Sequence, residues 1–176
     1  MIYKNPWITV REDRVIRPGG RKGIFGIVET NGGASIVAID QKGYCYLTKE
    51  YGYAVGKSTI GVIGGGIEKG EKPLEGAKRE LLEETGLQSN KWHHLGRINY
   101  FDTLFRTPEH LFLALDVRRT AKPTNEESKF IKVIRIKFRK AVRMAFTSEI
   151  YRAESIAAIF RAEHFLREKH LKFYTK

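Results

Sequence analysis

The segment from Gly65 to Leu87 reads GGIEKGEKPLEGAKRELLEETGL, and it is the most informative stretch of the chain. Its second half predicts a helix over Pro73–Thr85, because proline suits the first helical turn and Gly86 suits the position after the last one. On a helical projection, four residues form one stripe that is expected to face the core: Leu74, Ala77, Leu81 and Thr85.

Three carboxylates occupy a second face of this predicted helix. Glu80, Glu83 and Glu84 lie within two turns, where like charges repel and weaken a helix. A divalent cation removes that repulsion, and hard oxygen ligands suit Mg²⁺ or Mn²⁺. Arg79, four residues before Glu83, is placed to orient that carboxylate, and Gly76 leaves room for a ligand beside the backbone. The alternative is a solvated, charge-rich helix without a ligand.

Short strands joined by tight turns are predicted on both sides of this segment. The pattern favours strands over 7–16, 24–29, 34–40, 44–48, 92–100, 111–117 and 130–138. The stretches 51–57 and 64–71 are interpreted as glycine-rich loops, and helices are expected over 141–146 and 154–166. The sum is an α+β or α/β/α protein, with a mixed sheet that carries one central helix and C-terminal helices.

Composition limits the class of protein. The chain has 176 residues, of which 41% are hydrophobic, so it is long enough for one folded domain and too apolar for a disordered polyelectrolyte. Its single cysteine, Cys45, excludes a disulfide framework and a multi-cysteine zinc site. No apolar run reaches membrane-spanning length, and the N-terminus lacks the apolar core of a signal peptide. We expect a soluble cytoplasmic protein without a membrane partner.

The charge distribution sharpens this picture. The formal net charge is +12, which favours an anionic partner such as a nucleotide or a nucleic acid. The segment from Gly65 to Leu87 instead carries six acidic and four basic side chains, a net charge of −2. A local acidic cluster inside a basic protein is consistent with a cation site surrounded by positive potential.

The segment resembles the Nudix box, G-x5-E-x7-R-E-U-x-E-E-x-G-U, in which U is apolar. Every specified position matches, with Gly65, Glu71, Arg79-Glu80-Leu81, Glu83-Glu84, Gly86 and Leu87 at unchanged spacing. The resemblance implies an α/β fold, in which a mixed sheet lies between helices as an α/β/α sandwich. Residues 1–176 are expected to form a single domain of this kind, with an N-terminal strand extension over about 1–20. The resemblance also implies Mg²⁺- or Mn²⁺-dependent hydrolysis of a nucleoside diphosphate linked to another group.

Roles follow residue by residue from that resemblance. Glu80, Glu84 and Glu83 are the implied metal ligands together with the carbonyl of Gly64, and Glu83 is also a candidate to orient the attacking water. Arg79 is the implied positioner, and Glu71 and Gly86 maintain the structure of the box. Members of this family often recruit a further glutamate outside the box, for which Glu127 is the first choice and Glu126 the second. The candidates for substrate contacts are Gly65, Gly66, Arg106 and Tyr53.

The rest of the chain is similar to the ADP-ribose pyrophosphatase branch, which implies cleavage of ADP-ribose to AMP and ribose 5-phosphate, and a homodimer. Two segments depart from that branch. Its arginine in the aromatic loop is missing from Glu50-Tyr51-Gly52-Tyr53, and its Glu-Leu-Pro is replaced by Gly61-Val62-Ile63. The alternatives are therefore a GDP-mannose-like nucleotide sugar, an RNA 5′ end, or a non-catalytic domain that senses nucleotides.

Overall fold

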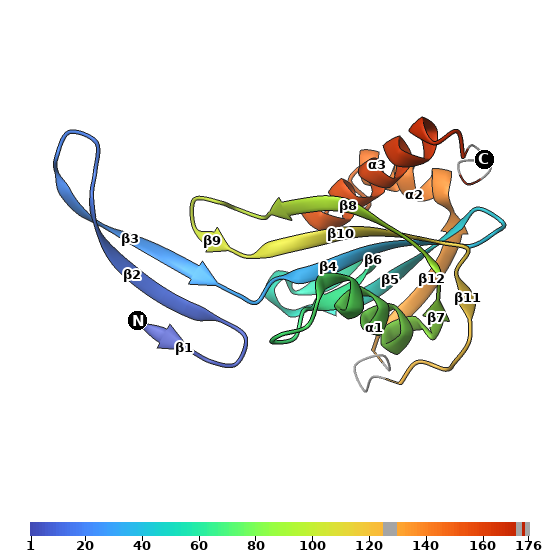
Figure 1. The fold of residues 1–176 in the computed structure, drawn as a ribbon, viewed down its shortest axis with the longest axis horizontal. Coiled ribbons are helices and arrows are strands. Elements are labelled where there is room, and N and C mark those ends of the chain that lie inside the picture. The colour runs from blue at the N-terminus through green and yellow to red at the C-terminus, as the bar shows by residue number, and fades with distance from the viewer. Residues whose placement is uncertain (125–129, 172–173, 175–176) are drawn as a thin grey trace.

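The computed structural model describes residues 1–124, 130–171 and 174. Its centre is a mixed sheet with the strand order β12-β5-β6-β4-β10-β8 (Figure 1). These strands are β4 (Gly33–Ile39), β5 (Tyr44–Gly52), β6 (Lys57–Gly66), β8 (Lys91–Asn99), β10 (Pro108–Leu115) and β12 (Lys132–Lys137). Strands β4 and β10 run parallel, whereas β4–β6, β5–β6, β12–β5 and β10–β8 are antiparallel.

Two hydrophobic cores lie on opposite faces of the sheet. Strand β4 is buried along its whole length, and its side chains alternate between the two cores because successive residues of a strand point to opposite faces. Ile36 packs toward helix α1 (Pro73–Thr85), whereas Val37 packs toward α2 (Phe138–Phe146) and α3 (Ala153–Glu168). The predicted α/β/α sandwich with a mixed sheet is therefore confirmed.

The central helix has the predicted bounds. Pro73 occupies the first turn of α1, and Gly86 ends the helix with a φ of 67°, a left-handed conformation that glycine adopts without steric cost. Helix α2 begins at Phe138, three residues earlier than predicted, because Phe138 is fully buried and anchors the helix start in the core. Helix α3 extends slightly beyond the predicted 154–166 at both ends.

The interpretation of 64–71 as a loop was wrong for its first three residues, because Gly64, Gly65 and Gly66 end strand β6 (Lys57–Gly66) in the middle of the sheet, and the loop begins only after them. Glycine obscures a strand in the sequence, since it lacks the branched side chains that indicate one. The structure needs glycine there: a Cβ atom on Gly64 would lie 2.2 Å from the carbonyl oxygen of Ala34. In the other predicted loop, 51–57, strand β5 continues to Gly52, and Tyr53–Val55 form the 3₁₀ turn η1.

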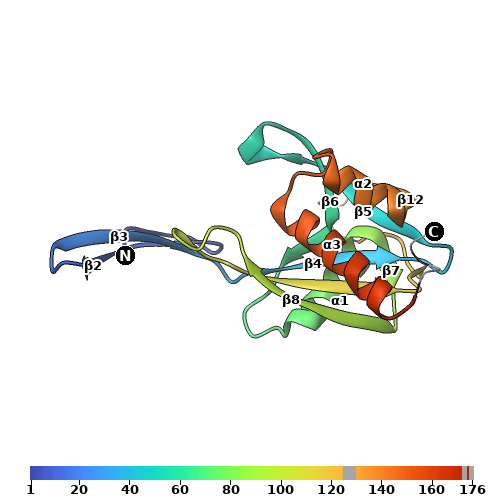
Figure 2. The ribbon, with the colours of Figure 1, turned by 90° about the horizontal axis from the view of Figure 1, so that it is seen from above.

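A separate sheet forms an arm that projects from the body (Figures 1 and 2). It has the order β1-β2-β3-β9, formed by β1 (Tyr3–Lys4), β2 (Thr9–Ile16), β3 (Lys22–Glu29) and β9 (Phe105–Arg106). The arm runs to Glu29 along the chain, further than the expected extension over about 1–20. It exposes several large apolar side chains: Ile2, Tyr3, Trp7, Ile16, Ile24 and Phe25.

A two-stranded pairing of β7 (Leu87–Gln88) with β11 (Arg118–Arg119) continues beyond the C-terminal end of α1. Among the residues that the structure describes, none of the helices is long and apolar enough to span a membrane.

Candidate functional site

The carboxylate face of α1 lies against the end of β6. A Cβ atom on Gly65 would come within 2.4 to 2.6 Å of the carboxylate atoms of Glu80, so only glycine allows this approach. Glu80 is 9% exposed and Glu84 is 8% exposed. The predicted helix thus brings two buried carboxylates directly beside the glycine-rich strand end.

Arg79 is the centre of a hydrogen-bond network that holds this face together. Its Nη1 donates to Glu80 Oε1 at 2.7 Å and to Glu83 Oε2 at 3.2 Å. Its Nη2 donates to the carbonyl of Gly66 at 2.9 Å. The predicted contact between Arg79 and Glu83 is therefore present, and one guanidinium fork fixes two carboxylates and the strand end.

Glu71 provides the other half of this network. It accepts Arg79 Nε at 3.0 Å and Arg79 Nη2 at 3.1 Å, and it also accepts the backbone N–H of Glu68 at 2.9 Å. The hydrogen bonds from Arg79 hold the pKa of Glu71 below its usual range. The Glu71 carboxylate also occupies the space beside Gly76, where a Cβ atom would lie 2.9 Å from Glu71 Oε2. The room at Gly76 therefore serves Glu71, which corrects the expectation that a ligand approaches there.

Glu84 is electrostatically the most unfavourable side chain of the site. Burial raises its pKa to about 8, and the negative charges of Glu80 and Glu50 contribute to the shift. Its Oε2 is buried and has no hydrogen-bond partner. A buried carboxylate oxygen without a partner is costly, and a bound cation would satisfy it.

The donor set fits a hard divalent cation, since it combines this free oxygen of Glu84 with the neighbouring oxygens of Glu80. Within 1–124, 130–171 and 174, no three His, Cys, Asp or Glu side chains are already gathered closely enough to hold a metal ion. Arg79 accounts for this arrangement, because Glu80 and Glu83 both point to its guanidinium. Arg79 binds one oxygen of each of these two carboxylates, so the second oxygen of each would be available to a cation beside Glu84.

A cavity of about 220 Å³ opens next to the strand end. We call it the box cavity; its lining includes Gly64, Gly65 and Gly66 and five side chains that the sequence did not single out: Ser35, Tyr100, Glu109, Arg152 and Glu154. Ser35 Oγ donates to Glu109 Oε1 at 2.5 Å, and Tyr100 is hydrogen-bonded to the same carboxylate. Burial raises the pKa of Glu109. These residues come from four separate segments, so no local motif indicated them.

The position of Arg152 explains why Gly61 stands where the ADP-ribose pyrophosphatase branch has the glutamate of its Glu-Leu-Pro sequence. A Cβ atom on Gly61 would lie 3.1 Å from Arg152 Cδ and 2.8 Å from Ser155 Oγ, so the missing side chain makes room for the start of α3. Arg152 Nε donates to Glu154 Oε1 at 2.5 Å, and its Nη1 donates to Glu50. Arg152 therefore brings a guanidinium to the box cavity from an element distant in sequence from the aromatic loop.

We expect Arg152→Gln to destabilise the protein by about 1 to 2 kcal/mol, less than the loss of a fully buried ion pair costs, because Arg152 and Glu50 are each about a third exposed and only Glu154 is buried. The substitution leaves the buried Glu154 without its cation, and likewise Glu50, whose negative charge acts on Glu84. Urea denaturation of the metal-free protein measures the effect. The double variant Arg152→Gln/Glu154→Gln is the control and should recover part of the loss. Wild-type stability of the single variant would contradict the proposed role.

The structure places the other predicted substrate residues away from the box cavity. Tyr53 is 94% exposed in the turn η1. Arg106 lies in β9, where its Nη1 donates to Glu29 Oε1 at 3.2 Å, and it lines a cleft between the arm and the body. Their contacts with substrate stay predictions. Glu126 and Glu127 lie outside the described residues.

Comparisons with known proteins identify the families that the chain matches. The family model described as "NUDIX domain" matches residues 29–155, and the one described as "Nucleoside diphosphate sugar hydrolase N-terminal domain" matches residues 1–28. An ADP-ribose pyrophosphatase of Bacillus subtilis (strain 168) is 27% identical over 90% of this chain and 86% of its own length. A methanol dehydrogenase activator of Bacillus methanolicus is 25% identical over the same shares. A crystal structure titled as an ADP compounds hydrolase shares the fold with a TM-score of 0.78, at 20% identity over 95% of this chain and 98% of that one.

Proposed function

Because the chain belongs to the NUDIX domain family of hydrolases, we propose that it cleaves the diphosphate bond of a nucleoside diphosphate sugar, with ADP-ribose preferred. The observation that carries the proposal is the buried, unpartnered oxygen of Glu84 beside Glu80 and the end of β6, at the edge of the box cavity. The similarity to a pyrophosphatase of ADP-ribose and to nucleoside diphosphate sugar hydrolases supports this substrate class.

Glu80, Glu84 and the backbone of Gly64 would hold Mg²⁺ or Mn²⁺, with Glu83 as a further ligand. When bound, the ion supplies charge neutralisation to the diphosphate and lowers the pKa of water at the site. Arg79 positions Glu80 and Glu83 in the absence of the ion, and its bonds to Glu71 and Gly66 keep it in place. A glutamate from the segment outside the described residues, Glu127 or Glu126, is proposed as the base.

The N-terminal arm supports the proposed homodimer. Its large apolar side chains, such as Trp7 and Phe25, are exposed in the isolated chain, and a protein surface rarely exposes so many together without a partner. Light scattering should give a mass of about 40 kDa, twice the 20.2 kDa of one chain, as for a twofold dimer. A mass of one chain at micromolar concentration would contradict the dimer.

A substrate panel tests the proposed function. We expect wild-type protein with Mg²⁺ to convert ADP-ribose to AMP and ribose 5-phosphate, with a higher kcat/KM than for GDP-mannose or 5′-triphosphorylated RNA. Mass spectrometry of the products identifies the bond that breaks. Faster turnover of GDP-mannose would move the preference to another nucleotide sugar, within the same class that the N-terminal family match indicates. Nucleotide binding without turnover of any member of the panel would contradict catalysis.

A further inference from the structure

A second cleft lies at the opposite end of the sheet from the box cavity. The parallel strands β4 and β10 connect the two places: Ser35 and Glu109 near their starts line the box cavity, and Asp40 and Asp116, just beyond their ends, line the second cleft. A strand of this length spans about 20 Å, so the two sites are separate. The second cleft, here called the distal cleft, has a volume of about 730 Å³, within the range of small-molecule sites.

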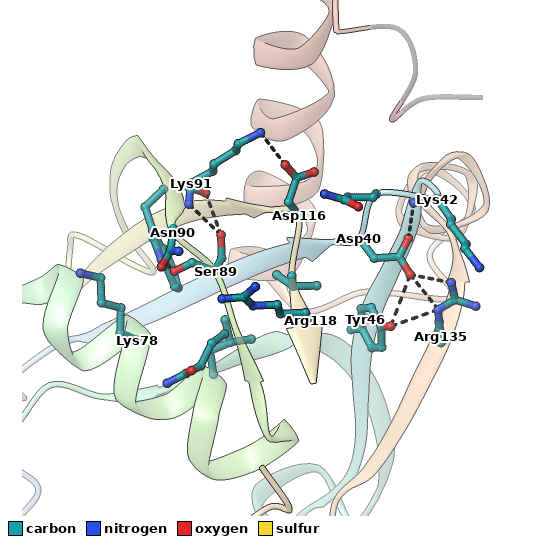
Figure 3. A pocket seen from close by; sticks show the side chains of 15 residues that line it. Asp40, Lys42, Tyr46, Lys78, Ser89, Asn90, Lys91, Asp116, Arg118 and Arg135 are labelled. Atoms are coloured by element: carbon teal, nitrogen blue, oxygen red, sulfur yellow. Dashed lines mark hydrogen bonds and ion pairs between the residues drawn. The ribbon is translucent and has the colours of Figure 1, made fainter. Parts of the chain in front are cut away.

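The acidic groups of the distal cleft are already neutralised. Asp40 accepts Arg135 Nε at 2.9 Å and Arg135 Nη2 at 2.5 Å, and these bonds are visible on the right of Figure 3. Lys91 Nζ lies 2.5 Å from Asp116 Oδ2. Each carboxylate of the cleft therefore has its own cation, and neither is available to attract a metal ion or a further base.

Besides Arg135 and Lys91, three cations line the cleft, Lys42, Lys78 and Arg118, and none of the ion pairs among the described residues includes them. Lys78 projects from α1 and Arg118 from β11, and both side chains are exposed. Within the part of the chain that the structure describes, neither forms an ion pair with a carboxylate. Figure 3 shows Arg118 between Lys78 and the group formed by Asp40, Tyr46 and Arg135. The cleft therefore has a net positive charge, with unpaired donors that come from two different elements.

The remaining lining suits a ligand that is only partly anionic. Trp92 supplies partly exposed apolar surface, whereas Leu81 and Val117 lie buried behind the lining. The indole N–H of Trp92 is already bound to the carbonyl of Ser89. Gln88 and Asn90 supply neutral hydrogen-bonding groups at the rim. Small-molecule sites typically combine such apolar surface with a few polar groups that fix orientation.

We propose that the distal cleft binds a phosphorylated small molecule, with its phosphate oxygens bound by Lys78 and Arg118. A guanidinium and an ammonium bind phosphate through charge-assisted hydrogen bonds. The box carboxylates repel phosphate when no metal ion is present, whereas the distal cleft needs no metal ion to attract it. Binding in the absence of divalent ions therefore distinguishes the two sites, and it does not depend on the proposed hydrolytic function.

Calorimetric titration of the wild-type protein with inorganic pyrophosphate, in buffer containing EDTA, tests the proposal. Each lost charge-assisted contact should weaken binding at least about tenfold, so Lys78→Gln/Arg118→Gln should bind about 100-fold more weakly. Both side chains are exposed, so the substitutions leave the core intact. The control variant Arg139→Gln/Lys140→Gln removes the same charge from the exposed face of α2 and should bind as the wild type does.

Tryptophan fluorescence locates the binding event. The chain has two tryptophans, so Trp7→Phe leaves Trp92, which lines the distal cleft, as the sole reporter. Pyrophosphate should change the fluorescence of this variant in EDTA with the dissociation constant that calorimetry gives. Absence of metal-independent binding, equal binding by Lys78→Gln/Arg118→Gln, or an unchanged Trp92 signal would each overturn the proposal.

Discussion

Arg79→Lys should lower kcat for ADP-ribose about 100-fold, although it keeps the positive charge. Loss of a residue that orients metal ligands typically lowers activity by about 10- to 100-fold, and we expect the upper end of that range. The guanidinium of Arg79 reaches Glu71, Glu80, Glu83 and the Gly66 carbonyl at the same time. A lysine ammonium is a compact charge that cannot reproduce this fork. Its loss should free Glu80 and Glu83 from their fixed orientation and separate the helix from the end of β6.

The measurement is steady-state kinetics at saturating Mg²⁺, with thermal unfolding recorded in parallel. Arg139→Lys on the exposed face of α2 is the matched control and should be silent. Because Arg79→Lys also removes hydrogen bonds from the partly buried Glu71, we expect a lower Tm as well. An unchanged kcat would show that the network around Arg79 does not position the site.

Glu84→Gln should have the opposite effects on activity and on stability. The amide cannot supply the anionic oxygen that the proposed metal site needs, so kcat should fall about 1000-fold, as expected when several kcal/mol of transition-state stabilisation are lost. The same substitution replaces a buried carboxyl group, whose ionisation next to Glu80 and Glu50 is unfavourable, with a group that cannot ionise. The metal-free variant should therefore be more stable than the metal-free wild type, with a Tm higher by about 5 °C.

The pH dependence of this effect has a definite sign. In the folded state the pKa of Glu84 is raised from the usual 4.5 to about 8, mainly by burial. The folded protein then holds a proton that the unfolded chain releases, so stability of the metal-free wild type declines as pH rises between these two values. Glu84→Gln should lack this part of the decline. The difference in Tm between the two proteins should accordingly grow from pH 5 to pH 8.

The sequence was sufficient to predict those parts of the site that lie within the single helix α1. The bounds of α1 and the contact of Arg79 with Glu83 were confirmed, because proline, glycine and i,i+4 spacing act within a few residues. Gly76 shows that even within this helix the sequence did not predict every contact. Its open space is filled by Glu71, a contact that depends on how the preceding loop folds back onto the helix.

The remainder of the site depends on contacts between distant segments. Glu109, Ser35 and Arg152 meet at the box cavity from β10, β4 and the start of α3, and none of them has a local pattern that distinguishes it from other polar residues. Strand β6 was missed for a related reason. Its glycines are required by close contacts with β4 and with Glu80, and these contacts are invisible until the sheet is assembled.

Turnover of ADP-ribose by Glu84→Gln, compared with wild type and with Glu75→Gln, tests the central claim most directly. Glu75 lies in the exposed first turn of the same helix, so its substitution removes an equal charge outside the site. We predict that wild type and Glu75→Gln release AMP and ribose 5-phosphate at similar rates with saturating Mg²⁺, and that Glu84→Gln is slower by about 1000-fold. Wild-type turnover by a folded Glu84→Gln variant would contradict the assignment of this carboxylate face as the hydrolytic centre.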